Sequence, residues 1–181
     1  AKPHVNMEKS AYSHFNINII KNSFEAEVNN FVNLFKNNNG NFKYRCAITN
    51  EINNGTIVFP KDPLVLKEGF KRIFSKIRDY DIKEVLGGVK DKILQEQLAE
   101  LAFIAIGKMF DDLFIRVLLE TLKDKVSQEQ LAELASIAIN KMRGKVEIGW
   151  LLHTLKDKVS PEQLENLKCQ RDLKFACCTI M

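Results

Sequence analysis

The sequence predicts a mostly α-helical protein with one small β-hairpin, built as a compact α+β unit followed by stacked helical hairpins. Two observations lead to this fold class. A segment recurs with a spacing of 33 residues along the C-terminal half, which is typical of helical units that stack on one another. Fourteen of the sixteen asparagines lie within the first 54 residues, whereas the remainder is rich in helix formers. The N-terminal third is therefore expected to differ in structure from the rest.

Residues 1–41 are expected to form a helical N-terminal segment. Between residues 19 and 36, apolar side chains recur at steps of three and four, which predicts an amphipathic helix with an apolar face of Ile20, Phe24, Val28, Phe31 and Phe35. Ser23 is the predicted N-cap of this helix. The Asn-Asn-Asn-Gly run at 37–40 is expected to stop it, because Asn and Gly tolerate left-handed backbone conformations.

Two short strand candidates follow, at residues 44–48 and 56–59. The first alternates along its length, and the second is β-branched and aromatic. Asn-Asn-Gly at 53–55 supplies a turn between them, so a β-hairpin is predicted. A helix at about 64–77 is expected next, with an apolar side of Leu66, Phe70, Ile73, Phe74 and Ile77.

From residue 90 onward the sequence repeats itself. Lys-Asp-Lys stands at 90–92, 123–125 and 156–158, and Gln-Glu-Gln-Leu-Ala-Glu-Leu-Ala stands at 95–102 and 128–135. The copies lack strand-forming composition, so each is expected to be a helix-turn-helix unit within a repeat region at 94–175. The expected helices are 95–109, 112–126, 128–142, 146–158 and 161–175, followed by a flexible tail at 176–181.

The repeats carry their own start signals. Ser127 and Ser160 are predicted N-caps, and Gln130 and Gln163, three residues further on, complete a capping box in each case. Pro161 falls at the first helical position, where the missing N–H has no effect on the helix. The Lys-Asp-Lys runs are expected to be solvated helix ends.

The composition is that of a globular chain: 45% of the residues are hydrophobic, 28% are charged, and the formal net charge is +4. A charge this small does not imply nucleic acid as a partner. The four cysteines form no CxxC pair and lie at no ligand spacing from the three histidines, so neither zinc nor another metal is expected. No cofactor is expected either, because Gly87-Gly88 is a break rather than a phosphate-binding loop. The low cysteine content fits a reducing, cytosol-like compartment.

Residues 44–52 read Tyr-Arg-Cys-Ala-Ile-Thr-Asn-Glu-Ile and resemble the opening of a U-box domain, the zinc-free, RING-like module of a class of E3 ubiquitin ligases. The family's first loop runs aromatic-x-Cys-Pro-Ile-Thr-x-Glu-hydrophobic, and the matches in register are Cys46, Ile48, Thr49, Glu51, Ile52 and Ile57. The resemblance implies a U-box-like unit at 42–93, or extending to 110. Ala47 replaces the usual proline, and the family's second loop has no counterpart between 78 and 93. The alternative interpretation is a structural hairpin with a locally buried cysteine.

The resemblance implies an enzyme that performs no covalent chemistry itself. It would dock a ubiquitin-charged E2 enzyme and hold the thioester in a reactive geometry, which is catalysis by positioning. By correspondence with the family, Ile48 would contact the E2, Asn50 would lie at the same rim, and the helical repeats would bind the protein target. Together with a candidate lipid signal, this combination resembles effectors that intracellular bacteria deliver into host cells.

The candidate lipid signal is the final tetrapeptide, Cys-Thr-Ile-Met at 178–181. It fits the C-a-a-X prenylation pattern with a farnesyl group on Cys178, and Cys177 beside it is a candidate for palmitoylation. One prenyl chain binds membranes only marginally, so a second signal would matter. The other interpretation is a chance match or a tail packed on the core. The expected location is the cytosol or a peripheral membrane site of a eukaryotic cell, which for a secreted effector would be the host cell.

The alternative function is that of a non-enzymatic adaptor. Stacked helical hairpins present a concave surface for a partner protein, and this hypothesis depends on the repeat alone. The exposure of Ile48 separates the two hypotheses, because a residue buried by the repeats cannot contact an E2. A metal-dependent or hydrolytic enzyme has no supporting group of residues in the sequence.

Overall fold

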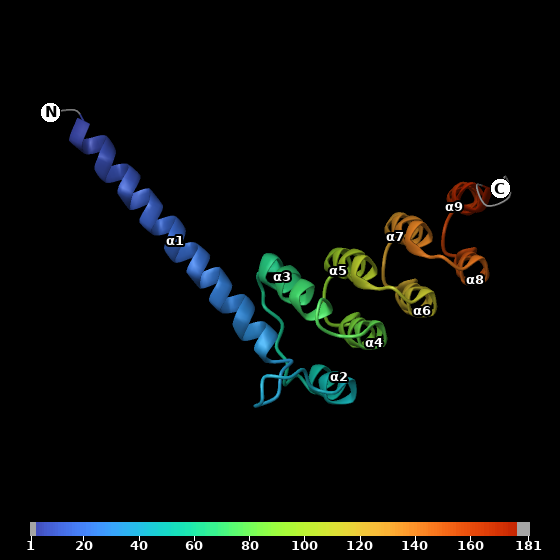
Figure 1. Cartoon of the computed structure of the whole chain (residues 1–181), viewed down its shortest axis with the longest axis horizontal. Coiled ribbons are helices and arrows are strands. Elements are labelled where there is room, and N and C mark those ends of the chain that lie inside the picture. Colours follow the sequence, from blue (N-terminus) through green and yellow to red (C-terminus); the bar gives the residue numbers. More distant parts are fainter. Residues whose placement is uncertain (1–2, 177–181) are drawn as a thin grey trace.

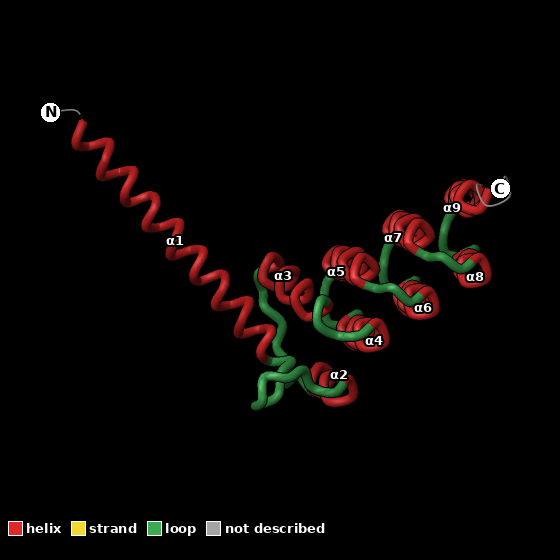
Figure 2. The backbone as a smooth tube through the Cα atoms, in the orientation of Figure 1, coloured by secondary structure: helices red, strands yellow, loops and turns green. Residues whose placement is uncertain are grey.

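The computed structural model of the chain describes the backbone of residues 3–176 and the side chains of residues 16–176, and every regular element within them is an α-helix. The helices are α1 (Pro3–Asn33), α2 (Arg45–Asn53), α3 (Pro63–Phe74), α4 (Asp79–Val89), α5 (Gln95–Lys108), α6 (Asp112–Leu122), α7 (Gln128–Lys141), α8 (Lys145–Leu155) and α9 (Pro161–Ala176). Figures 1 and 2 show two rows of helices: α3, α5, α7 and α9 form one, and α2, α4, α6 and α8 form the other.

The described part of the stack consists of the helical pairs α2–α3, α4–α5, α6–α7 and α8–α9. Each helix packs on the one two places further along the chain, so neighbouring pairs lie side by side. The core follows the repeat, because the fourth residue of every even-numbered helix is a buried isoleucine: Ile48, Ile82, Ile115 and Ile148. Since Ile48 occupies this shared position, α2–α3 is the first unit of the stack.

The helices predicted in the repeat region are confirmed to within four residues at each end. Both predicted capping boxes are present. Ser127 Oγ accepts a hydrogen bond from the Gln130 amide (3.1 Å), and Gln130 Oε1 accepts one from the Ser127 amide (2.9 Å). Ser160 and Gln163 form the same pair of bonds at 3.0 and 2.8 Å. Each box therefore satisfies amides that the first helical turn leaves without an intrahelical acceptor.

The predicted β-hairpin is wrong. Residues 45–48 of the first candidate strand form the first turn of α2. The second candidate strand, at 56–59, is not a strand and pairs with no strand within the described residues. Ile48 and Ile52 are four residues apart and both buried, and α2 packs on α4. Over five residues, the alternation of a strand is too short to distinguish from the spacing of an α-helix. Packing of Ile48 and Ile52 against α4 favours the helix. The residues expected to form a U-box-like α+β unit are therefore the start of the helical stack.

α1 is longer than predicted and begins well before Ser23, the expected N-cap. Its C-terminal part packs on α3 through Val28 and Phe31, whereas its N-terminal part projects from the stack in Figure 1. The helix ends just before the Asn-Asn-Asn-Gly run, as predicted, and Gly40 has a φ of 79° there. Glycine is the residue that adopts this left-handed conformation without strain.

The Lys-Asp-Lys runs link neighbouring units as well as ending helices. Lys125 Nζ lies 2.7 Å from the Asp91 carboxylate, and Lys158 Nζ lies 2.5 Å from that of Asp124. A further lysine, Lys141 on α7, donates hydrogen bonds to the carbonyl oxygens of residues 106 and 107 at the end of α5. Each unit is thus joined to the next by polar contacts as well as by the core.

Candidate binding site

The two residues predicted to bind an E2, Ile48 and Asn50, differ in their exposure to solvent. Ile48 is 1% exposed and faces the core, whereas Asn50 is exposed on α2. Ile48 therefore presents no apolar surface to a partner, and the hypothesis that it docks an E2 loses its structural basis. Cys177 and Cys178, the candidate lipidation sites, lie outside the described residues.

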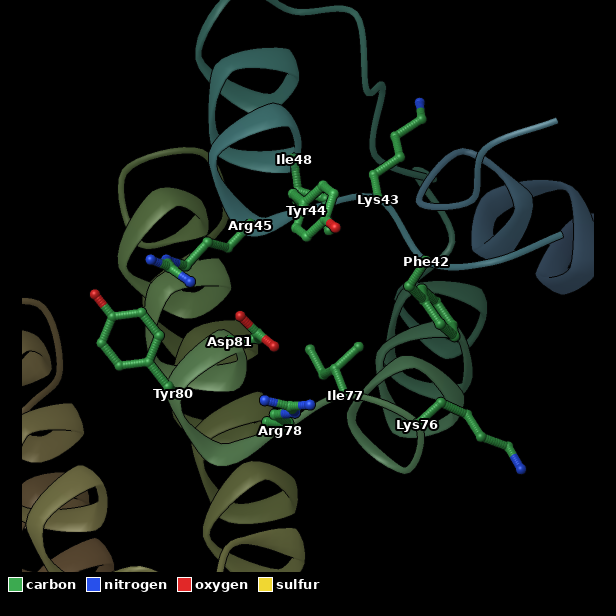
Figure 3. A pocket seen from close by; sticks show the side chains of 10 residues that line it. All are labelled: Phe42, Lys43, Tyr44, Arg45, Ile48, Lys76, Ile77, Arg78, Tyr80 and Asp81. Carbon is green, nitrogen blue, oxygen red and sulfur yellow. The ribbon is translucent and has the colours of Figure 1, made fainter. Parts of the chain in front are cut away.

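A cleft of about 520 Å³ opens beside the N-terminal ends of α2 and α4. Figure 3 shows that its walls come from the segment before α2, the first turn of α2, the connection between α3 and α4, and the first turn of α4. We name it the basic cleft, and its lining residues are Phe42, Lys43, Tyr44, Arg45, Ile48, Lys76, Ile77, Arg78, Tyr80 and Asp81.

The basic cleft has four cationic side chains and one carboxylate, that of Asp81, in its lining. Lys43 is engaged, because its Nζ lies 2.9 Å from Glu51 Oε2. Arg45, Lys76 and Arg78 have no ion-pair partner among the described residues. Three positive charges thus remain without an ion-pair partner in one cleft.

Aromatic rings lie among these charges. The Arg45 guanidinium stands over the Tyr80 ring, 4.5 Å from its centroid, and Lys83 Nζ lies 4.4 Å from the same centroid. The cation–π contact holds Arg45 in place without neutralising it, whereas Lys83 is paired with Glu84 at 2.9 Å. Tyr44, at the other wall, is 85% exposed. The cleft therefore offers both positive charge and accessible aromatic surface.

The start of α2 adds to the positive potential of the cleft. α2 and α4 both begin at the cleft, and their N-cap residues, Tyr44 and Arg78, make no side-chain hydrogen bond to the first turn. Asp62 and Asp111 do cap the starts of α3 and α6 in this way. The amides at the uncapped start of α2 carry partial positive charge, which reinforces that of the side chains. At the start of α4, Asp79 and Asp81 in the first turn offset this effect.

Sequence reasoning missed this site. Its two halves, at 42–48 and 76–81, are distant in the chain and meet only because α2 packs on α4. One signal was available: four cations, Lys71, Arg72, Lys76 and Arg78, lie within eight residues. Within this cluster, Arg72 pairs with Glu25 on α1 at 2.8 Å, whereas Lys76 and Arg78 line the cleft.

Other chemistry is sparse in the described part of the chain. Cys46 and Cys169 are exposed free thiols, and residues 16–176 hold no group of three or more His, Cys, Asp or Glu side chains placed to bind a metal ion. None of the described helices has the length and apolarity of a membrane span.

The chain matches none of the protein-family models, curated proteins or solved structures with which it was compared. By its architecture it is a helical-repeat protein, in which paired helices stack along one direction.

Proposed function

We propose that the chain is a non-enzymatic adaptor, in which the helical stack is a scaffold and the basic cleft binds an acidic segment of a partner protein. The observation that supports this proposal is the gathering of Arg45, Lys76 and Arg78 around one cleft, all three without an ion-pair partner among the described residues. An acidic segment would supply the missing counterions.

The lining suits a peptide that carries both carboxylates and aromatic or apolar side chains. Arginine recognises carboxylates in a bidentate geometry, and Tyr44 gives a partner an exposed ring on which to pack. An exposed ion pair contributes only about 0.2–1 kcal/mol, so the segment must contact several charges at once. Binding through such contacts is fast and weakens with added salt.

A fluorescein-labelled peptide of alternating Glu and Tyr residues is a direct probe, with fluorescence anisotropy as the measurement. We expect the double variant Lys76→Glu/Arg78→Glu to bind about tenfold more weakly or worse, which corresponds to roughly 1.4 kcal/mol. Both side chains are exposed, so the substitutions leave the core intact.

The matched control is Arg143→Glu/Lys145→Glu, which changes the net charge by the same amount at the start of α8. This variant is expected to keep the wild-type affinity. Equal losses in the two double variants would show a response to net charge alone and contradict the proposal, as would failure of the wild type to bind at low salt.

Ubiquitin-ligase activity stays a prediction, and a ubiquitin-transfer assay with a panel of E2 enzymes tests it. Ile48→Lys is unsuitable as the loss-of-function control, because a lysine at this buried position would disrupt the stack. Asn50→Lys, on the exposed side of α2, is the better variant. E2-dependent chains that this substitution abolishes would favour the ligase over the adaptor. Lipidation of Cys178 and Cys177 also stays a prediction, which mass spectrometry of the chain produced in eukaryotic cells tests.

A further inference from the structure

The aspartate that opens one even-numbered helix binds the backbone amides just before the next even-numbered helix. Asp79, the first residue of α4, accepts hydrogen bonds from the amides of residues 110 and 111 at 2.7 and 2.6 Å. Asp112, the first residue of α6, accepts them from the amides of residues 143 and 144 at 3.0 and 2.6 Å. In both cases the amides belong to the N-cap residue of the next even-numbered helix and to the residue before it. The stack thus contains two carboxylate sites of the same construction.

The corresponding site before α4 lacks its aspartate. Its amides are those of Ile77 and Arg78, and the residue that opens the preceding even-numbered helix, α2, is Arg45. These two amides donate no hydrogen bond within the described residues. The backbone is alike at all three sites, because the N-cap residues of α4, α6 and α8 are extended. Ile77, Arg78 and Arg45 all line the basic cleft. The cleft therefore lies where the chain itself supplies a carboxylate in the next two units.

We infer that the amides of Ile77 and Arg78 bind a side-chain carboxylate of the partner's acidic segment, in the place that Asp79 and Asp112 take in the next two units. This inference rests on the proposed function and specifies the contact that anchors the partner. The bonds are charge-assisted, and such bonds are shorter and stronger than those between neutral groups. The guanidinium groups of Arg45 and Arg78 in the same lining add to the attraction.

The acidic residues in the first turn of α4 are compatible with a bound carboxylate. Asp79 is directed to the next unit, where it binds the amides described above. Asp81, the third residue of α4, lines the cleft. The third residue of α8 is also acidic, Glu147, and the amides before α8 still bind a carboxylate. Arg116 pairs with Glu147 there, and in the basic cleft three cations without an ion-pair partner lie in the same lining as Asp81.

The NMR shifts of the amide protons test the inference, because a hydrogen bond to a carboxylate deshields the proton. The probe is the unlabelled Glu/Tyr peptide with an acetylated N-terminus and an amidated C-terminus, so its side chains hold its only carboxylates. Saturation with this peptide is expected to move the amide protons of Ile77 and Arg78 downfield. A Gln/Tyr peptide of the same length is the control and is expected to leave them unchanged. Binding of the Glu/Tyr peptide without these downfield shifts would overturn the inference and leave the adaptor proposal standing, whereas a Glu/Tyr peptide that does not bind would contradict both.

Arg45→Asp tests the same contact without a peptide. Arg45 is exposed and aspartate suits the first turn of a helix, so this variant keeps its fold. The new carboxylate is expected to bind the amides of Ile77 and Arg78 from within the chain. Both protons then move downfield in the free protein, and the Glu/Tyr peptide binds tenfold more weakly or worse. Arg45→Ala is the control, because it removes the same cation but supplies no carboxylate, and both protons are expected to stay close to their wild-type positions. Identical proton shifts in the two variants would overturn the inference.

Discussion

Gly69 determines how closely α1 approaches the stack. A Cβ atom at this position would lie 2.4 Å from Cδ1 of Phe31. The Phe31 ring is buried and makes edge contacts with Phe35 and Phe70, with centroid distances of 5.3 Å in both cases. Because the ring is held on several sides, it cannot move away from an added methyl group without disturbing its neighbours.

Gly69→Ala is therefore expected to destabilise the protein by about 1–3 kcal/mol through overpacking. Thermal or urea unfolding measures this change. Gly149→Ala is the control: Gly149 also lies inside a helix, but nothing is within 4 Å of its added Cβ. The control is expected to gain about 0.5–1 kcal/mol from better helix propensity. Equal stabilisation by both substitutions would contradict the packing of α1 on α3.

At the scale of the elements, the ion pairs between loops make the stability of the stack depend on pH. The hydrogen bond from Lys158 holds the pKa of the Asp124 carboxyl below its ordinary value, against a smaller opposing effect of desolvation. Since the carboxyl binds its proton less readily in the folded chain, the pair stabilises the fold above the ordinary pKa of 3.8. This contribution is lost as the pH falls through the lowered, folded-state value.

Asp124→Asn is accordingly expected to reduce the fall in Tm between neutral and strongly acidic pH, with the variant less stable than wild type on the neutral side. The effect is small, because both partners are largely exposed. Asp157→Asn is the matched control: Asp157 holds the same place in the last Lys-Asp-Lys run but forms no ion pair among the described residues. Identical pH profiles for the two variants would show that the contact between units contributes nothing.

The elements differ in how well the sequence predicts them. The repeat helices could be predicted because two nearly identical copies mark the core positions and the Ser/Gln boxes mark the starts. No helix was predicted at the position of α4, although Ile82, Val85, Leu86 and Val89 follow helical spacing. The U-box resemblance has no counterpart for its second loop between 78 and 93, and Gly87-Gly88 indicated a break. Gly87 and Gly88 predict a break yet lie inside α4, where packing on α2 and α6 outweighs their weak helix propensity.

The site was less predictable than the helices. Ile48 matched a motif at the correct sequence position, but a motif does not say whether a residue faces solvent or the core. Its place as the fourth residue of an even-numbered helix makes it a core residue. Arg45 and Arg78 line the same cleft only because α2 packs on α4. A local sequence pattern does not predict such a tertiary contact.

In the molecule as a whole, the two ends of the described stack differ in their packing. Among the described residues of α9, only Leu167 is fully buried, while Leu164 and Phe175 pack partly against the core and most of the other side chains are polar. At the other end, the C-terminal part of α1 packs on α3. The basic cleft, the candidate contact surface, lies near this N-terminal end of the stack.

The most direct test of the adaptor proposal is an NMR titration of the ¹⁵N-labelled protein with the acidic Glu/Tyr peptide. The cleft predicts saturable shifts of the backbone amides of Arg45, Arg78 and Tyr80, while the amides around Lys145 at the start of α8 stay unchanged. Shifts spread evenly over the exposed lysines and arginines, or centred on α8, would contradict a specific site in the basic cleft.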